Sequence, residues 1–230
     1  MKFSRRINPE TKPKKNFITK KRFKEDEIDF NKLRSYRLDR VKKELEKNNL
    51  EACILFDPVN VRYALDTVNM SIHNMHNLNR YCFIPVEGPT ILYEYFNCEK
   101  ISEHLSLIDE IRPSIAWDYF GNGSQVEVKL EKWINEVNDL CNSYFKSKKI
   151  AIDVLNGPAV LGLNKIGIEV VDAKSILEKA RLIKSPEELK CMKAAIEVAE
   201  IGVSKMRDEL KAGMTEDELW SILHKTNIEY

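Results

Sequence analysis

The stretch Ala180-Arg181-Leu182-Ile183-Lys184-Ser185-Pro186-Glu187-Glu188-Leu189 marks a change of character within this sequence of 230 residues. It contains the signals of a helix start, because Ser185 can cap a helix, Pro186 suits its first position and Glu188 can complete a capping box. The predicted helix reaches about residue 210. Its apolar side chains recur at helical spacing on one stripe, which consists of Leu189, Met192, Ile196, Ala199, Val203 and Met206.

A second helix is predicted close to the end of the chain. The pair Ala212-Gly213 ends the first helix, and Thr215-Glu216-Asp217-Glu218 forms another capping box. The apolar residues of the helix that follows are Leu219, Trp220, Ile222 and Leu223. Because two helices cannot bury their own apolar faces as an independent domain, we expect residues 175–230 to be a linker and the start of a truncated second domain.

Upstream, residues 29–174 alternate between helical and strand patterns. Amphipathic helices are predicted at residues 31–48 and 125–145, and a hairpin is predicted from strands 81–85 and 90–96. Further elements are expected as strands at 52–56, 108–113, 115–120, 149–154 and 168–171, helices at 98–105, 157–165 and 175–182, and a helical turn or short strand at 61–65. This alternation predicts an α/β domain with a mixed sheet and helices on its faces.

The first 28 residues differ from the rest in charge. Residues 1–24 carry ten Lys or Arg against Glu10 alone, although the whole chain has a net charge of only +1. With Pro9 and Pro13 and no apolar periodicity, residues 1–28 are interpreted as a basic disordered tail. A nucleic-acid arm and an organelle transit peptide are the alternatives. The tail is Lys-rich rather than Arg- and Ser-rich, which counts against a transit peptide. No stacking aromatics follow it in a basic domain, so we expect no nucleic-acid partner.

The cysteines and the hydropathy pattern indicate the compartment. The five cysteines include no C-x-x-C pair, are odd in number and mostly have apolar neighbours. Buried thiols in a reducing compartment are therefore expected, without a zinc or redox motif. The N-terminus has no apolar signal core and no apolar run is long enough to cross a bilayer. We expect a cytoplasmic protein with no membrane partner.

Several of these segments, in this order, resemble a known family. The stretch 180–189, then Ala194-Ala195 and Ala199-Glu200, then Ala212-Gly213-Met214-Thr215-Glu216 look like the opening of the catalytic domain in the creatinase/prolidase/Xaa-Pro aminopeptidase family. Asp57-Pro58-Val59-Asn60-Val61-Arg62-Tyr63 resembles the Asn-x-x-Tyr segment of that family, although Asp66 stands where relatives commonly carry glycine. The resemblance covers residues 31–230. It implies a creatinase-like amino-terminal domain followed by the first helices of a truncated pita-bread catalytic domain.

A narrower resemblance concerns one branch of this family. Asn79-Arg80-Tyr81-Cys82-Phe83, the run from Phe96 through Pro113, and Leu223-His224-Lys225-Thr226-Asn227 resemble the branch that contains the dimethylsulfoniopropionate lyases. This implies a homodimeric parent acting on a small molecule by β-elimination, with release of dimethyl sulfide and acrylate. An Xaa-Pro aminopeptidase or prolidase activity remains open, as does a non-catalytic dimerisation or regulatory short form.

The resemblance also implies where the metal chemistry resides. The family binds divalent metal ions through two Asp, one His and two Glu of its catalytic domain, beyond the segment matched here. No catalytic or metal-binding residue is therefore expected within this chain, which by itself should bind no metal and be inactive. His73 and His76 form an H-x-x-H pattern without further ligands at a suitable spacing, so a surface or interface role is favoured for both.

Four residues are candidates for substrate binding. Trp117 and Tyr119, with Phe120 beside them, are predicted at a strand end, where they would pack the sheet edge or a dimer contact. In the family, the amino-terminal domain of one subunit reaches the active-site mouth of its partner. A sulfonium cation would bind well against such aromatic faces. His76 and Arg80 would serve the same mouth, with Arg80 pairing a substrate carboxylate.

Overall fold

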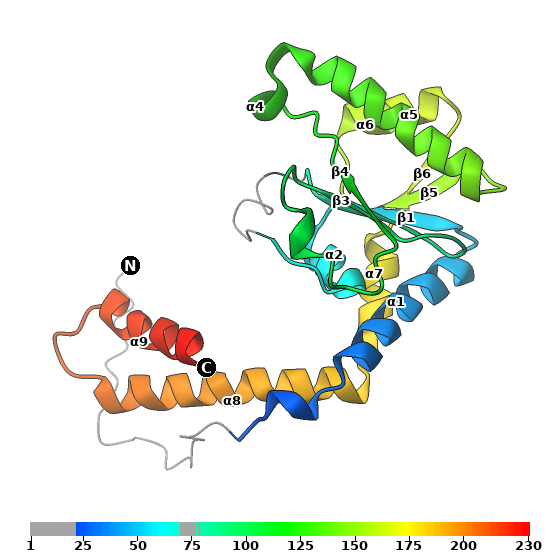
Figure 1. Ribbon diagram of the computed structural model, residues 1–230. Helices are drawn as coiled ribbons and strands as arrows, with labels where there is room; N and C mark the ends of the chain where they lie inside the picture. Colours follow the sequence, from blue (N-terminus) through cyan, green and yellow to red (C-terminus); the bar gives the residue numbers. More distant parts are fainter. Residues whose placement is uncertain (1–21, 70–76, 78) are drawn as a thin grey trace. The chain divides into compact units, whose positions relative to one another are not determined.

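The computed structural model describes residues 22–69, 77 and 79–230, which form two compact units (Figure 1). One unit comprises Phe30–Ser185, and the other comprises Pro186–Tyr230 together with residues 22–29. His73 and His76 lie outside the described residues, so their predicted roles stay untested.

The first unit is built on a six-stranded mixed sheet (Figure 1). β1 pairs in antiparallel fashion with β2, and β2 with β3, whereas the pairs β1–β5, β5–β6 and β3–β4 are parallel. All strands except β2 therefore end at the same edge, where β2 begins. Across the sheet the strands run in the order β4 (Glu110–Pro113), β3 (Ile91–Glu94), β2 (Tyr81–Pro85), β1 (Ala52–Leu55), β5 (Lys149–Ile152) and β6 (Glu169–Asp172).

Helices cover both faces of this sheet (Figure 1). One face packs against α1 (Phe30–Lys47), α2 (Pro58–Leu65) and α7 (Lys174–Leu182), and the other packs against α5 (Val126–Tyr144) and α6 (Gly157–Lys165). Side chains of β1 alternate between the two cores, with Cys53 and Leu55 on one side and Ala52 and Ile54 on the other. Burial on both faces explains why the central strands are continuous apolar runs. The predicted α/β fold with a covered mixed sheet is confirmed.

Most of the predicted elements are present. Residues 61–65, where a helical turn or short strand was expected, belong to helix α2, because Asp57 caps this helix by accepting from the backbone N–H groups of Val59 and Asn60. The helix expected at residues 98–105 is reduced to the 3-10 turn Glu99–Ile101. The hairpin and the helices predicted at 31–48, 125–145 and 157–165 are confirmed.

The segment predicted to be a strand at residues 115–120 is instead a loop that leads into α4 (Tyr119–Asn122). The strand prediction was wrong because Asp118 starts a helical turn. Its Oδ1 accepts a hydrogen bond of 2.7 Å from the backbone N–H of Gly121, a contact that competes with sheet pairing. A 3-10 turn, Gly123–Gln125, then joins α4 to α5.

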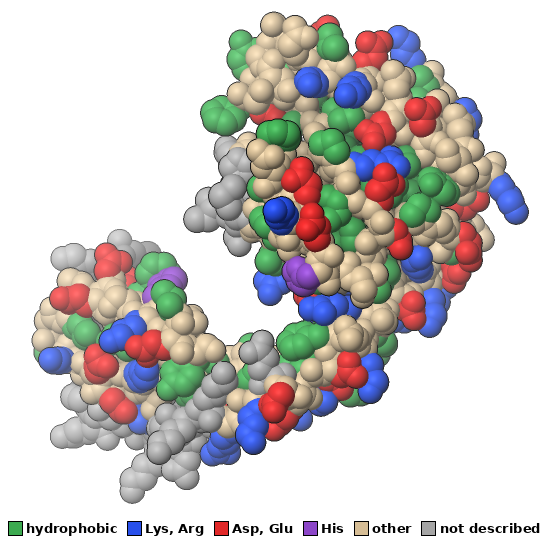
Figure 2. Space-filling model, in the orientation of Figure 1, with side chains coloured by type: hydrophobic (Ala, Val, Ile, Leu, Met, Phe, Trp, Pro, Cys, Tyr) green, Lys and Arg blue, Asp and Glu red, His purple; other side chains and the backbone are tan. Residues whose placement is uncertain are grey.

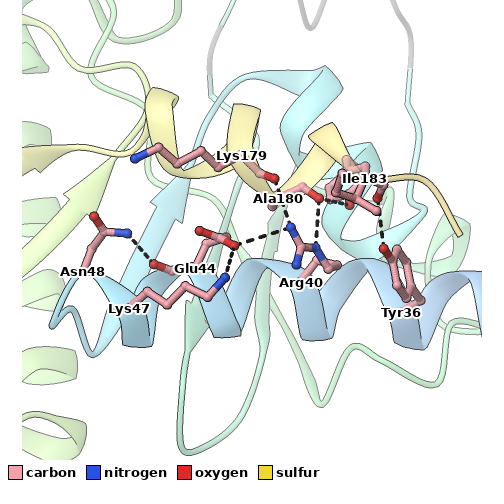
Figure 3. A network of polar contacts seen from close by, with 9 residues as sticks. Tyr36, Arg40, Glu44, Lys47, Asn48, Lys179, Ala180 and Ile183 are labelled. Carbon is pink, nitrogen blue, oxygen red and sulfur yellow. Dashed lines mark hydrogen bonds and ion pairs between the residues drawn. The ribbon is translucent and has the colours of Figure 1, made fainter.

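The last carbonyl groups of α7 are capped by side chains of α1 (Figure 3). Nη2 of Arg40 donates to the carbonyl oxygen of Lys179 at 3.1 Å, and its Nε donates to the carbonyl oxygen of Ala180 at 3.2 Å. The hydroxyl of Tyr36 donates to the carbonyl oxygen of Ile183 at 2.9 Å. Carbonyl groups at a helix end lack intrahelical partners, so these donors fix the point at which the chain leaves α7.

This packing places α7 in the α/β unit. Ile176, Leu177 and Ala180 are buried in the same core as α1 and α2. The compact unit therefore extends through Ser185, beyond residue 174, where the change in sequence character placed the domain boundary.

The two segments that carry the family resemblance meet on this side of the sheet. The buried hydroxyl of Tyr63 donates to the carbonyl oxygen of Ala180 at 3.0 Å. Nη1 of Arg181 donates to Oδ1 of Asn60 at 3.3 Å, and its guanidinium lies 6.0 Å from the centre of the Tyr63 ring. Asn60 and Tyr63 thus connect α2 directly to the end of α7.

The second unit contains α8 (Pro186–Glu209) and α9 (Glu216–Glu229). The predicted capping box at the start of α9 is present, with Thr215 and Glu218 bonded reciprocally. The two helices approach closely at Gly202, where an added Cβ would lie 2.5 Å from Cδ1 of Leu223. Much of the apolar stripe predicted on α8 is exposed, namely Leu189, Met192, Ile196, Ala199 and Val203.

The end of the predicted basic tail is attached to α8. The backbone N–H groups of Arg22 and Phe23 donate to Oε2 of Glu197 at 3.0 and 2.8 Å, and that of Asp29 donates to Oε2 of Glu187 at 2.9 Å. Residues 22–28 therefore have defined contacts, contrary to the prediction of disorder over residues 1–28, of which 1–21 lie outside the described part.

The capping of α7 makes a prediction about stability. Tyr63→Phe removes a buried hydroxyl donor and should lower the free energy of unfolding by about 1 kcal/mol. Tyr36→Phe is the matched control, because the carbonyl that it releases is exposed and can bind water, so its cost should stay below about 0.5 kcal/mol. Urea unfolding of both variants measures the difference. Equal losses of unfolding free energy in the two variants would show that the buried hydrogen bond of Tyr63 stabilises the protein no more than the exposed hydrogen bond of Tyr36.

Candidate functional site

A cavity lies at the edge of the sheet where β1, β4 and β5 end. Its volume is about 330 Å³. Phe56 follows β1, Trp117 and Asp118 follow β4, and the remaining lining residues are Asn77 and Asn79 before β2 and Val154, Leu155 and Asn156 after β5. In open α/β sheets, ligands bind in the crevice outside the carboxyl ends of the strands. We call this space the Trp117 cavity.

The aromatic wall of the Trp117 cavity is part of a longer stack. The ring of Trp117 lies 4.5 Å from that of the buried Trp133 and meets Phe56 edge-on at 5.9 Å. Phe56 in turn lies 4.8 Å from Tyr81, which stacks on Tyr93 at 4.4 Å. This packing holds the half-buried Trp117 ring in one orientation.

Asp118 supplies the charge of the cavity. Its Oδ2 accepts from Nδ2 of Asn79 at 2.7 Å, while its Oδ1 accepts from the backbone of Gly121. No lysine or arginine belongs to the described lining, which carries this carboxylate and the side-chain amides of Asn77, Asn79 and Asn156. The cavity is therefore apolar on its aromatic side and negative on its polar side.

A second cavity of about 330 Å³ adjoins the first through Val154. Its central group is the Asp153 carboxylate, which accepts from the backbone N–H groups of Phe56 and Asp57 at 2.8 and 3.2 Å and from Nδ2 of Asn60 at 3.0 Å. Burial raises the pKa of Asp153 above that of an ordinary aspartate. The rest of the lining mixes both signs of charge and includes Lys174, Glu178 and Arg181.

The predicted substrate-binding residues occupy different environments. Trp117 lines the cavity, whereas Tyr119 is 78% exposed on α4 and does not line it. His76 lies outside the described residues. Sequence reasoning missed Phe56, Asp118 and the asparagines, although their positions at strand ends could have indicated them.

Arg80 is buried in an ion pair. It is 4% exposed, and its Nε lies 2.7 Å from Oε2 of Glu94, which is fully buried. Its Nη2 also contacts Oγ1 of Thr67, and Oε1 of Glu94 accepts from Nδ2 of Asn69 at 3.0 Å. These contacts join the two ends of the segment between α2 and β2. The guanidinium therefore has a structural role here, contrary to the expectation that it pairs a substrate carboxylate.

The described residues do not fit the metal centre of the family. Nowhere in residues 22–69, 77 and 79–230 do three or more His, Cys, Asp or Glu side chains come together so that they could hold a metal ion. No helix within that part of the chain is long and apolar enough to span a membrane. On the face shown in Figure 2, acidic and basic side chains are interspersed over the surface.

Two curated relatives are similar to this chain over most of its length. A dimethylsulfoniopropionate lyase DddP from Roseobacter denitrificans is 31% identical over 202 residues, which cover 85% of this chain and 45% of the relative. The lyase of the same name from Roseovarius nubinhibens is 30% identical over 207 residues, which cover 87% of this chain and 46% of that relative. The chain belongs to the creatinase/prolidase/Xaa-Pro aminopeptidase family. It matches the amino-terminal part of that family and spans slightly less than half the length of these two relatives.

Solved structures of the family share the fold. An Xaa-Pro dipeptidase from Bacillus anthracis superposes with a TM-score of 0.61 at 16% identity, covering 85% of this chain and 49% of that one. A prolidase from Thermococcus sibiricus gives a TM-score of 0.62 at 17% identity, and the match covers 84% of this chain and 49% of the prolidase. No family model matches the sequence. The two structures support the creatinase-like fold and, at this level of identity, the fold alone.

The burial of Arg80 predicts a large effect of its removal. Arg80→Met leaves the Glu94 carboxylate buried without its partner and should lower the free energy of unfolding by about 3–5 kcal/mol. Arg112→Met is the control, because Arg112 pairs with the exposed Glu110 at the same 2.7 Å and should cost at most about 1 kcal/mol. Chemical denaturation measures both. An Arg80→Met protein as stable as the control would return Arg80 to the substrate-binding candidates.

Proposed function

We propose that this chain is the amino-terminal part of a metal-dependent dimethylsulfoniopropionate lyase that releases dimethyl sulfide and acrylate. The observation that carries the proposal is the identity of 31% to a lyase of that name over 202 residues. The Xaa-Pro dipeptidase and the prolidase of similar fold described above are only 16% and 17% identical. The whole protein is proposed to be a cytoplasmic homodimer that acts on a small molecule.

The proposed reaction is an elimination. A base removes the proton on the carbon next to the substrate carboxylate, the C–S bond breaks, and dimethyl sulfide leaves with the bonding pair. The divalent metal of the family would supply Lewis-acid stabilisation of the carboxylate. The described residues include no group that could hold this metal, and the family resemblance assigns the metal and the base to the catalytic domain of the parent.

The residues of this chain would help to bind the substrate. Trp117 and Tyr119 are proposed to line the active-site mouth of the partner subunit, where their rings would face the sulfonium group. The exposure of Tyr119 and the rigid stacking of Trp117 support this role, because an exposed ring is accessible to a partner and a fixed ring needs no reordering.

The second candidate function is hydrolysis of Xaa-Pro peptide bonds. The similarity of fold to an Xaa-Pro dipeptidase and to a prolidase favours it. Both activities would use the same scaffold, and the groups that separate elimination from hydrolysis would lie in the catalytic domain.

The two functions are separated by assaying the complete protein encoded by the gene. We expect dimethyl sulfide from dimethylsulfoniopropionate in headspace gas chromatography and no cleavage of an Xaa-Pro dipeptide. The 230-residue chain should catalyse neither reaction, because its described residues hold no metal-ligand group. Cleavage of the dipeptide without dimethyl sulfide would contradict the lyase proposal, and a gene product that ends at Tyr230 and is inactive would favour a non-catalytic form.

The role of the aromatic residues has its own test in the complete enzyme. Trp117→Ala and Tyr119→Ala should each raise KM for dimethylsulfoniopropionate by about tenfold, which corresponds to about 1.4 kcal/mol of lost cation–π attraction. Tyr144→Ala is the control, because Tyr144 ends α5 beside the start of β5, near the opposite edge of the sheet. Unchanged KM and kcat in both variants would remove Trp117 and Tyr119 from the substrate site.

A further inference from the structure

We infer that the Trp117 cavity is itself a binding site for a small organic cation, a quaternary ammonium or a sulfonium group. In this site the ring of Trp117 is the apolar contact and the Asp118 carboxylate is the counter-charge. The inference deepens the proposed function by placing a cation site within this chain alone, and it rests on that function only for the choice of dimethylsulfoniopropionate as one probe.

The size and place of the cavity suit a small ligand. Its volume of about 330 Å³ is at the lower end of the range in which proteins bind small molecules. It opens where β1 and β5 end side by side and where β2 begins on the other flank of β1. Residues from four separate segments converge there, so the space is formed by the fold rather than by one loop.

The wall of the cavity is suited to a cation that cannot donate hydrogen bonds. Phe56, Trp117, Val154 and Leu155 supply an apolar surface, and the stack of Trp117 on Trp133 fixes the ring before any ligand arrives. A methylated ammonium or sulfonium group is attracted to such a face by the ring quadrupole, and more strongly when the site is shielded from water. Preorganisation reduces the entropy lost on binding.

The charge of the lining selects the sign of the ligand. Each oxygen of the Asp118 carboxylate accepts one described hydrogen bond, which leaves lone pairs for a further interaction. The described lining has no lysine or arginine that would neutralise this charge. An anion would therefore meet the Asp118 carboxylate without a basic side chain of the described lining to offset it, and a cation would be stabilised by this carboxylate.

Two other cavities of the same unit lack this combination. The cavity around Asp153 contains Lys174 and Arg181, and three N–H donors already occupy the Asp153 carboxylate. The cavity of about 680 Å³ between β4 and α5 contains Arg112 and Lys132. Both linings mix basic with acidic side chains, which are Asp57 and Glu178 in the first and Glu136 and Asp139 in the second, and neither contains a tryptophan. The Trp117 cavity is therefore the one to test.

The test is calorimetric titration of the 230-residue chain with tetramethylammonium, dimethylsulfoniopropionate and 3-(methylthio)propionate, an anion without the sulfonium charge. We expect saturable binding of tetramethylammonium and of dimethylsulfoniopropionate, a zwitterion whose sulfonium group would contact the Trp117 ring, and no binding of 3-(methylthio)propionate. Asp118→Asn and Trp117→Leu should each weaken cation binding by about tenfold. Matched controls are Asp109→Asn, which also accepts a backbone N–H at 2.7 Å, and Trp220→Leu on α9, and both should bind as the unchanged chain does.

Thermal melting of each variant separates loss of binding from loss of folding. If the Trp117→Leu variant does not fold, the inference is still tested by the Asp118→Asn variant. It is also tested by whether the unchanged chain binds tetramethylammonium and not 3-(methylthio)propionate. Absence of saturable cation binding, or binding unaffected in folded Asp118→Asn, overturns the inference. Cation binding by the chain without dimethyl sulfide release by the complete protein leaves this site standing and removes the proposed lyase function. Release of dimethyl sulfide by the complete protein without cation binding by the chain removes this site and leaves the proposed lyase function standing.

Discussion

The contact between α2 and the end of α7 is the interaction on which the rest of the α/β unit depends. Tyr63 donates to the carbonyl of Ala180, and Asn60 accepts from Arg181, so two segments far apart in the sequence close one side of the sheet. Arg40 of α1 donates to the same Ala180 carbonyl. The carbonyl groups at the end of α7 are thereby satisfied by tertiary donors, and α1, α2 and α7 are held as one layer.

The same contact reaches the candidate site through a chain of hydrogen bonds. Asn60 donates to Asp153, and Asp153 accepts from the backbone N–H of Phe56, which lines the Trp117 cavity. The ends of β1 and β5 are therefore tied together at the point where the cavity opens. On the other side, Asn79 holds Asp118, and the buried pair of Arg80 and Glu94 joins the ends of the segment that precedes β2.

Features determined by local chemistry could be predicted from the sequence. The central strands are apolar runs because both faces are buried, and the start of α9 is specified by the Thr215–Glu218 box. Trp117 could be singled out as an aromatic residue near a strand end, but its partner Trp133 lies on another element. Arg80 could not be assigned correctly, because its role is set by Glu94, whose burial arises only when β2 and β3 pair. The start of α4 was missed because a side-chain cap at Asp118 outweighed the strand-like pattern.

Asn60 and Arg181 join the two family segments through a hydrogen bond, and we expect this contact to stabilise the α/β unit. A double-mutant cycle with Asn60→Ala and Arg181→Met, measured by urea unfolding of the 230-residue chain, tests it directly. The account predicts a coupling energy of about 1 kcal/mol, because the two side chains share a hydrogen bond beside the buried Tyr63. Single-variant effects that add to within about 0.3 kcal/mol would contradict it, and would mean that the two segments meet without stabilising one another.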